Sequence, residues 1–484
     1  MSPALILLII ALYFTLLLFI GWLTGRKANS EGFFVGNRRS PWIVVSIGMI
    51  GASLSGVTFI SVPGWVIDSQ FSYMQMVLGY LAGYVVIAEI LLPLYYRLRL
   101  TSIYTYLSER FGRHTYKTGA LFFLLSRTIG ASFRLYLVAS VLQLTVFDSW
   151  NVPFILTVLI TLALIWLYTY RGGIKTIIWT DTLQTFFMLS AVVLTVVFIS
   201  KSLDLDFRSL VATVRENGLS RIFFFDDLND QRHFLKQFFG GMFITIVMTG
   251  LDQDMMQKNL SCRNVSDARK NVYLYSFAFV PVNLIFLVLG VLLVIYAGFA
   301  GIAIPDQTDN LFPIIATSGG LGNLVTILFI LGLIAAAYSS ADSALTSLTT
   351  SFTVDILERS GEEESKLRNT RSRVHLLFTI LLAGTIMLFR SVNDQSVISA
   401  LFTVAGYTYG PLLGMYAFGL FTRWQVNDRL MPLVAILSPV ICILVNKYSE
   451  ALLGGYKFGF ELLILNGLIT FAGMFIIRKN SQGR

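Results

Sequence analysis

The sequence predicts an all-α protein that crosses a membrane many times. Of its 484 residues, 55% are hydrophobic and only 13% are charged, whereas soluble domains average about 25% charged residues. The mean hydropathy is +0.72. Apolar segments recur along the chain, each close to the roughly 20 residues that a helix needs to cross a bilayer. We therefore expect about thirteen transmembrane helices in one membrane domain that covers residues 1–484.

The first apolar segment has no basic residues before it and continues into Arg26 and Lys27. This pattern is typical of a retained span and not of a cleaved signal peptide. No linker divides the segments into separate domains. The predicted spans lie near residues 4–24, 41–66, 73–97, 118–146, 152–170, 176–200, 235–256, 271–299, 311–355, 374–390, 395–421, 430–447 and 458–477.

Basic residues predict the orientation of these spans. Most of the 36 Lys and Arg residues fall in alternate loops, among them the segment 258–270. Because basic residues concentrate in cytoplasmic loops, we expect the N-terminus outside and the C-terminus in the cytoplasm. The net charge of +9 then reflects orientation, and we expect the lipid bilayer, not a nucleic acid, as the partner of this chain.

Two predicted spans are interrupted at corresponding places. Glycines fall within residues 48–56 of the second span, and a polar run occupies residues 249–254 of the seventh. Breaks five spans apart are typical of two inverted five-helix repeats, here about 41–200 and 235–421, with extra helices at the N- and C-terminal ends. Unwound backbone at membrane depth is tolerated where it lines a cavity. The alternative is that the glycines only allow close helix packing.

A run of hydroxyl side chains lies inside the apolar segment 311–355. Helical spacing places Ser339, Ser340, Ser343 and Ser347 on one face, and oxygen ligands suit a small hard cation. Asp181 lies inside another span, where a charge costs about 2.5–3.5 kcal/mol on insertion scales. Sodium bound between Asp181 and the serines would compensate this charge. An interfacial Asp181 that reaches water is the alternative, and the same two interpretations apply to Asp342.

These motifs together resemble the sodium:solute symporter family over about residues 5–478. Members share thirteen spans with two inverted repeats, and they couple inward sodium flow to uptake of sugars, amino acids, carboxylates, vitamins or sialic acids. The resemblance implies a multi-pass protein of the plasma membrane, with the bacterial inner membrane as the default. The motifs that carry it are Gly172-Gly173, Trp179-Thr180-Asp181-x-x-Gln184, Asp252-Gln253-Asp254-x-x-Gln257, Ala336-x-x-Ser339-Ser340-x-Asp342-Ser343 and Gly406-x-x-x-Gly410-Pro411-Leu412-Leu413-Gly414.

The resemblance also implies a principal sodium site with five oxygen ligands. Two backbone carbonyls come from the first broken helix, and one carbonyl and two hydroxyls come from the serine-rich span. In this sequence the corresponding residues are Gly51, Leu54, Ala336, Ser339 and Ser340. Sodium is the only metal expected, and it acts as the coupling ion; no other cofactor is expected.

A second sodium site is implied by the bacterial sialic acid branch of the family. Its ligands would be Asp181, Asp342 and Ser343, although that branch has a serine where this chain has Asp342. The additional carboxylate leaves two interpretations. The site binds sodium more tightly, or it binds a proton, since adjacent like charges raise a pKa.

The first broken helix is most similar to the sialic acid branch, whose hydroxyls hold a substrate carboxylate. That branch has an arginine where this chain has Ala131, but two arginines lie about one turn to either side, and either would fork onto a carboxylate. Structural pairing of these arginines is the alternative. The predicted substrate residues are Ser53, Ser55, Thr58, Gln75, Arg127 and Arg134, with Tyr409 as a further candidate.

We therefore expect a sodium-coupled symporter that imports a small carboxylate-bearing solute by alternating access. A sodium/sugar symporter is less favoured, because the gate residues of the sugar branch correspond to Thr245 and Met248. A proton-coupled carrier of the same fold is the other alternative. An enzyme is not expected, since the three histidines lie toward loops or span edges without a catalytic constellation. No obligate protein partner is evident.

Overall fold

The computed structural model describes residues 3–25, 30–359, 361–392 and 397–479. These residues form helices and connecting turns, with two isolated β-bridges and no extended strand among them. The all-α prediction is therefore confirmed. The ends of the predicted domain, residues 1–2 and 480–484, lie outside the described residues, as do positions 395–396 at the start of one predicted span.

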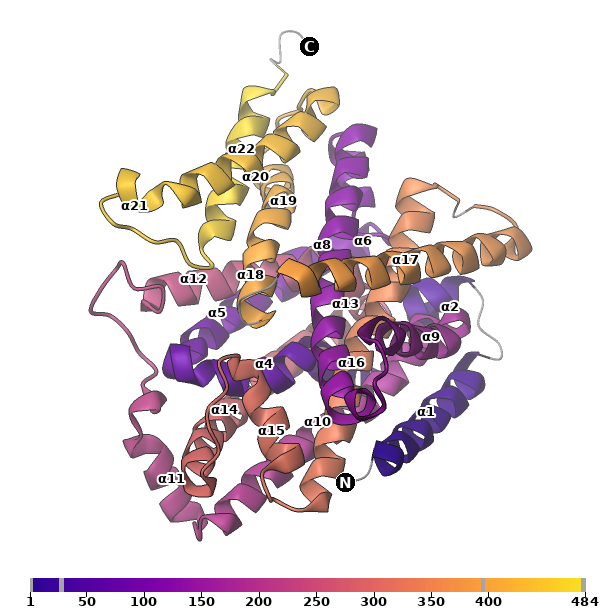
Figure 1. Ribbon diagram of the computed structural model, residues 1–484. Helices are drawn as coiled ribbons and strands as arrows, with labels where there is room; N and C mark the ends of the chain where they lie inside the picture. The colour runs from indigo at the N-terminus through magenta and orange to yellow at the C-terminus, as the bar shows by residue number, and fades with distance from the viewer. Residues whose placement is uncertain (1–2, 26–29, 360, 393–396, 480–484) are drawn as a thin grey trace.

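Each predicted span coincides with a helix or with a pair of helices (Figure 1). Short helices α2 (Ser30–Val35), α7 (Thr105–Arg110), α11 (Phe207–Glu216) and α21 (Ser449–Leu452) lie in the connections. The helices that form the predicted spans are α1 (Pro3–Gly25), α3 (Trp42–Ser53), α4 (Gly56–Ser69), α5 (Tyr73–Val86), α6 (Leu92–Arg97), α8 (Arg113–Leu142), α9 (Phe154–Gly172), α10 (Ile174–Ser202), α12 (Phe234–Thr245), α13 (Gln253–Asn259), α14 (Val265–Ala300), α15 (Leu311–Ser318), α16 (Asn323–Ser351), α17 (Glu364–Val392), α18 (Val397–Thr408), α19 (Gly410–Phe421), α20 (Met431–Lys447) and α22 (Leu462–Ile476).

Fewer helices than the expected thirteen are long and apolar enough to cross a membrane alone. Within the described residues there are 8 such helices, or up to 10 if each of two bent pairs forms one span. The difference arises where helices are broken or short. The continuous stretch Gly56–Arg97 covers parts of two predicted spans, and the apolar helices Trp42–Ser53, Phe154–Leu167 and Leu462–Ile476 are shorter than a full span.

Both predicted interruptions are real breaks in helices. The first separates α3 from α4 at Leu54 and Ser55. The second lies between a π-helical turn, Ile246–Gly250, and α13, with a bend of 69°. A third break, of 46°, separates α18 from α19. It was not predicted, although Gly410 and Pro411 at the start of α19 are a helix-breaking signal in the sequence.

Buried tyrosines satisfy the unwound backbone at the second break. The Tyr95 hydroxyl donates to the Gly250 carbonyl at 2.9 Å, and the Tyr104 hydroxyl donates to the Leu251 carbonyl at 3.0 Å. The Asp252 side chain caps α13 by accepting from the Asp254 amide at 2.9 Å. Since unpaired backbone groups are costly away from water, these contacts allow the helix to break at membrane depth.

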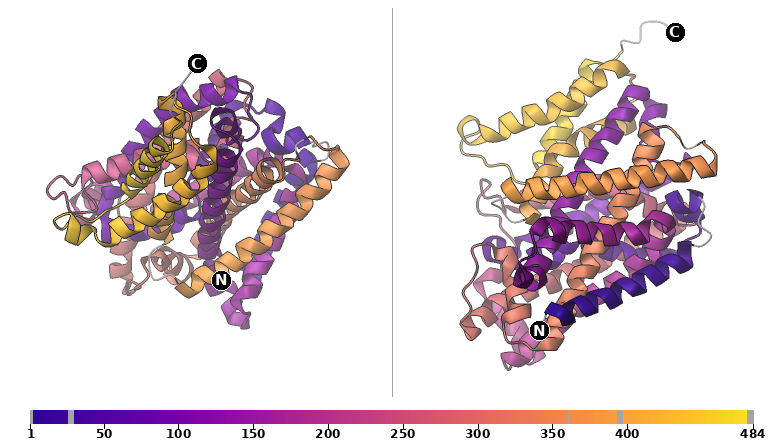
Figure 2. Two further views of the ribbon diagram at one scale, coloured as in Figure 1. Left: turned by 90° about the horizontal axis from the view of Figure 1, so that it is seen from above. Right: turned by 45° about the vertical axis from the view of Figure 1, so that its right-hand side comes forward.

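The broken helices lie in the interior of the bundle. Short helix α13 contacts α3, α10 and α16, and α16 contacts both halves of the first broken helix. Helix α1 lies at one edge and helices α20 and α22 at the opposite end, in Figure 1 and in the right-hand view of Figure 2. The division into two inverted repeats, 41–200 and 235–421, remains a prediction.

Glycines bring α5 and α12 into backbone contact. A Cβ atom added to Gly79 would lie 2.0 Å from the Phe238 carbonyl oxygen, and one added to Gly241 would lie 2.2 Å from the Met76 carbonyl oxygen. Small residues that let helix backbones approach closely are a common basis of helix association in membranes.

We predict that Gly79→Ala and Gly241→Ala each lower the thermal stability of the purified protein, because the added methyl group meets a backbone oxygen that cannot move away. Overpacking of this kind costs about 1–3 kcal/mol. Gly384→Ala in α17 is the matched control, since its Cβ meets nothing within 4 Å. Equal melting temperatures for all three variants would contradict this packing.

Candidate functional site

Helix α13 is polar and fully buried. Each of its polar residues is at most 1% exposed, so their partners must come from the surrounding helices. The Gln253 amide pairs with the backbone of Thr101 and Ile103, and the Gln257 amide donates to the Thr350 hydroxyl at 3.0 Å. The polar residues of α13 are Gln253, Asp254, Gln257, Lys258 and Asn259.

Two residues that were expected in or near loops are buried instead. Lys258 was expected in a cytoplasmic loop, but α13 continues past the second break and encloses it. His375 bridges Thr169 and Thr349 inside the bundle, at 2.9 Å from each hydroxyl. Both expectations were wrong because each residue adjoins a polar stretch of sequence, while its burial depends on which helices pack around it.

Asp181 is buried and paired, as its depth in α10 required. One carboxylate oxygen accepts from Lys258 Nζ at 2.7 Å, and the other accepts from the Ser339 hydroxyl at 2.6 Å. Helix α3 comes close at Gly48, where an added Cβ would lie 3.2 Å from the Asp181 Cβ. The interfacial interpretation of Asp181 does not hold, since its side chain is 0% exposed.

A second buried carboxylate joins α13 to two other helices. Asp254 accepts from Arg127 of α8 through one oxygen and from the Ser343 hydroxyl of α16 through the other. Its neighbour Asp252 accepts from the Tyr409 hydroxyl at the third break. Arg127 therefore has its own counter-ion, which favours the structural alternative for this arginine.

Arg134 lies about two turns further along α8 and has a different environment. Its side chain is buried, yet Nε and Nη1 have no hydrogen-bond partner. Tyr409 and Asp252 lie near its guanidinium group. A cavity of about 10 Å³ is found here, lined by Ser126, Arg127, Gly130, Arg134, Met248, Leu401, Val404, Ala405 and Tyr409.

The residues of the predicted principal sodium site lie on α3, at the first break and on α16. Ser339 and Ser340 are 1% and 2% exposed, so neither faces lipid. The Ser340 hydroxyl donates to the Ala336 carbonyl at 3.3 Å. Gly51 allows α3 to approach α10, since an added Cβ would lie 2.1 Å from the Thr185 hydroxyl oxygen. Helix α16 contacts both α3 and α4, the two helices that meet at Leu54 and Ser55.

Two residues of the predicted second sodium site, Asp181 and Ser343, hydrogen-bond to different partners. Asp181 binds Lys258 and Ser339. The Ser343 hydroxyl is directed to Asp254. Asp342 is buried, and one of its oxygens accepts from the backbone amide of Ser343.

The predicted substrate residues of the first broken helix are buried near the break. The Ser53 hydroxyl lies beside Tyr84, and Ser55 and Thr58 are 3% and 6% exposed. Gln75 binds backbone groups of the segment before α12. Its side-chain amide donates to the Arg232 carbonyl at 2.8 Å and accepts from the Phe224 backbone amide at 3.1 Å. These hydrogen bonds hold the segment that precedes α12, and a role of Gln75 toward the solute remains a prediction.

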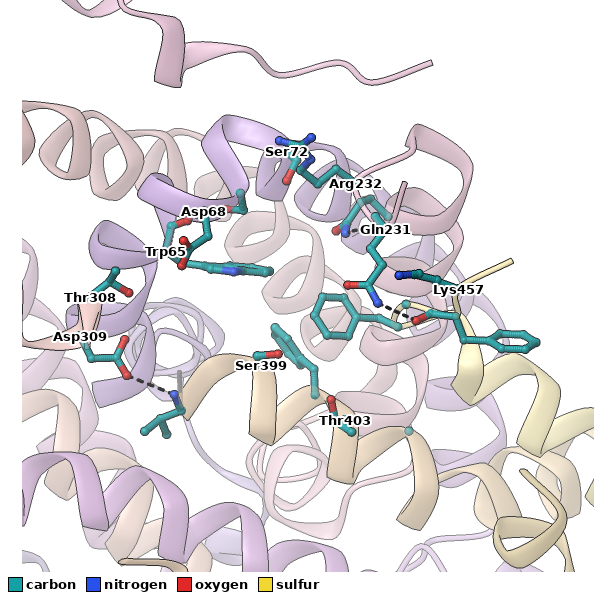
Figure 3. Close-up of a pocket in the computed structure, with 18 of the residues that line it drawn as sticks. Trp65, Asp68, Ser72, Gln231, Arg232, Thr308, Asp309, Ser399, Thr403 and Lys457 are labelled. Atoms are coloured by element: carbon teal, nitrogen blue, oxygen red, sulfur yellow. Dashed lines mark hydrogen bonds between the residues drawn. The ribbon is translucent and has the colours of Figure 1, made fainter. Parts of the chain in front are cut away.

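A larger cavity of about 990 Å³ opens at the face that was predicted to be outside (Figure 3). It lies between the end of α4, the segment before α15, helix α18, and the segments before α12 and α22. Carboxylates outnumber basic groups in its lining, so its field concentrates cations. The charged residues of this lining are Asp68, Asp230, Asp306, Asp309, Glu450, Arg232 and Lys457.

Asp309 links the segment before α15 to α18 at the large cavity. Its carboxylate accepts from the Val397 amide at 3.1 Å, at the start of α18 (Figure 3), where the helix dipole favours a negative charge. Burial raises the pKa of this carboxyl group. Gly64 allows the same segment to approach α4, since an added Cβ would lie 2.4 Å from the Thr308 carbonyl oxygen.

Residues of α8 and α18 line both cavities, and a layer of three aromatic rings lines the large cavity. Phe460 packs against Trp65 at 6.1 Å and against Phe402 at 5.1 Å between ring centroids, and all three rings line the large cavity. Neither cavity is lined by Ser53, Ser55 or Thr58.

The sodium:solute symporter family model matches residues 33–429 of this sequence. The chain belongs to the sodium:solute symporter family. The predicted resemblance is thereby confirmed, as is the expectation of a transporter and not an enzyme. The chain is a multi-pass membrane protein that carries out sodium-coupled solute symport, with sodium as the coupling ion.

Relatives within this family transport different solutes. The sodium/sialic acid symporter NanT of Aliivibrio fischeri is 24% identical over 441 residues, which cover 86% of this chain and 83% of NanT. The sodium-coupled monocarboxylate transporter 2 of Danio rerio is 26% identical over 405 residues, which cover 82% of this chain and 63% of that protein. A substrate-bound, outward-open structure of a Na⁺-coupled sialic acid symporter has the same fold, with a TM-score of 0.82, 18% identity and 98% coverage of both chains.

We predict that Asp254→Asn destabilises this symporter by about 3–5 kcal/mol, because it leaves the buried Arg127 charge without a counter-ion. Adding Arg127→Gln should restore much of the loss, since the double variant buries no unpaired charge. Thermal unfolding of the single and double variants measures this coupling. A double variant no more stable than Asp254→Asn would contradict the pairing.

Proposed function

We propose that this chain is a symporter of the bacterial inner membrane that imports a small carboxylate-bearing solute together with sodium. The observation that carries the proposal is Arg134, a buried guanidinium group with two donor nitrogens unpaired. A buried charge of this kind is costly unless it is paired, and a carboxylate matches the fork of a guanidinium group. Similarity to sialic acid and monocarboxylate symporters supports the same class of solute.

In this proposal the principal sodium site consists of Gly51, Leu54, Ala336, Ser339 and Ser340. Its support is the burial of both serines and the contact of α16 with both halves of the first broken helix. Carbonyl and hydroxyl oxygens replace the water around the ion. Sodium bound there would hold α16 against the break and would order the neighbouring Ser53, Ser55 and Thr58.

The proposed transport cycle is alternating access, with the N-terminus outside. Sodium enters through the acidic large cavity, the solute carboxylate binds at Arg134, and the aromatic layer of Trp65, Phe402 and Phe460 closes behind it. One elementary charge that moves down 100 mV supplies about 2.3 kcal/mol. This energy corresponds to about fortyfold accumulation of solute for each sodium.

Uptake into proteoliposomes tests the proposal. Radiolabelled sialic acid, a short-chain monocarboxylate and glucose should be compared under a sodium gradient and under a proton gradient in sodium-free buffer. We expect sodium-driven uptake of a carboxylate. Uptake of glucose alone would favour the sugar alternative, and uptake driven by protons without sodium would favour the proton-coupled alternative.

We predict that Ser340→Ala weakens sodium activation of uptake, because the principal site loses one of its two hydroxyl ligands. Ser347→Ala is the matched control. It lies on the same helix, and its hydroxyl donates to the Ala344 carbonyl at 3.0 Å. A sodium concentration for half-maximal uptake that is the same in the wild type and in Ser340→Ala would remove Ser340 from the site.

We predict that Arg134→Gln lowers the affinity for the carboxylate solute by about thirtyfold or more, because truncating one partner of a buried charged pair costs at least about 2 kcal/mol. Stabilisation by sodium alone should persist. Arg113→Gln, at the exposed end of α8, is the control for loss of an arginine. An unchanged KM for solute in Arg134→Gln would contradict the proposed role.

A further inference from the structure

Lys258 lies where a bound cation would compensate Asp181. Its side chain is 2% exposed, and Nζ lies 2.7 Å from one oxygen of the Asp181 carboxylate, which is itself fully buried. A lysine ammonium group carries the same single positive charge as a sodium ion. The counter-ion that Asp181 needs is therefore already supplied by the chain.

We propose that the Lys258 ammonium group is a tethered cation that permanently fills the second sodium site, so that this symporter binds one sodium ion. The inference rests on the proposed principal site, which supplies that one ion. It assigns to Lys258 a role in setting the sodium stoichiometry, and it replaces the interpretation of Asp181, Asp342 and Ser343 as ligands of a second ion.

The surrounding contacts support a fixed cation at this place. Both Asp181 oxygens are used, one by Lys258 and one by Ser339. With Lys258 in place, the Ser343 hydroxyl donates to Asp254 and not to Asp181. A sodium ion added beside Asp181 would also lie close to the ammonium group in a medium where charges are weakly screened, and their repulsion would oppose its binding.

The pair also orients a residue of the principal site. Because the Ser339 hydroxyl donates its proton to Asp181 at 2.6 Å, its oxygen lone pairs remain available to accept a cation. The adjacent Lys258 ammonium group favours the charged form of the Asp181 carboxylate, which accepts this hydrogen bond. Lys258 and Asp181 are thus positioning residues for Ser339. Because Lys258 lies in α13, they connect Ser339 to the helix that follows the second break.

Counting bound sodium ions tests the inference without a solute. Radiolabelled sodium binding to purified full-length protein should give one ion per chain in the wild type. Lys258→Met removes the ammonium group at similar side-chain volume, exposes Asp181 to sodium, and should raise the count to two. Lys258→Met combined with Asp181→Asn removes both charges and should return the count to one.

Adding Ser340→Ala to Lys258→Met separates the two sites, since sodium at Asp181 should survive the loss of the principal site. Two ions in the wild type, or one ion in a folded Lys258→Met variant, would overturn the inference. If Lys258→Met does not fold, two ions bound to the wild type would still overturn the inference. Absence of any sodium binding to the wild type would instead overturn the proposed principal site.

Discussion

The requirement that buried charges be paired within the protein shapes the centre of this symporter. Helix α13 contributes to two such ion pairs. Its Lys258 pairs with Asp181 of α10, and its Asp254 pairs with Arg127 of α8. Each carboxylate also accepts a hydrogen bond from a hydroxyl group of α16. Ser339 donates to Asp181, and Ser343 donates to Asp254. Removing one partner of such a pair costs several kcal/mol. These two pairs therefore hold α8, α10, α13 and α16 in register around the broken helices.

Pairing of these groups distinguishes Arg134 from its neighbours. Arg127 and Lys258 have counter-ions within the described structure, whereas two nitrogens of Arg134 have no hydrogen-bond partner. A solute carboxylate would provide the missing acceptor, and sodium would offset the negative charge that it brings into the bilayer. Coupling then has an electrostatic basis in this account, since anion and cation enter sites that are joined through Tyr409, Asp252 and α13.

Much of the fold follows from sequence because hydrophobic length and helix-breaking residues are local signals. The thirteen predicted segments coincide with helices, and the breaks at Leu54 and Leu251 were expected from glycines and a polar run. The third break was missed although Gly410 and Pro411 mark it, because hydrophobic length alone was used to define that span. Lys258 was placed in a loop because sequence gives its neighbours along the chain but not the carboxylate of Asp181 across the bundle. Similarly, Arg127 and Arg134 look equivalent until Asp254 is placed beside one of them.

The central claim is that sodium and a carboxylate bind together at the centre of this bundle. It is tested most directly by the melting temperature of the purified protein with a panel of solutes, measured with sodium and with choline in its place. A ligand that binds the native state raises stability by mass action. The account predicts that carboxylates raise the melting temperature only when sodium is present, and that their neutral amides do not. Equal stabilisation by acid and amide, or stabilisation that needs no sodium, would contradict it.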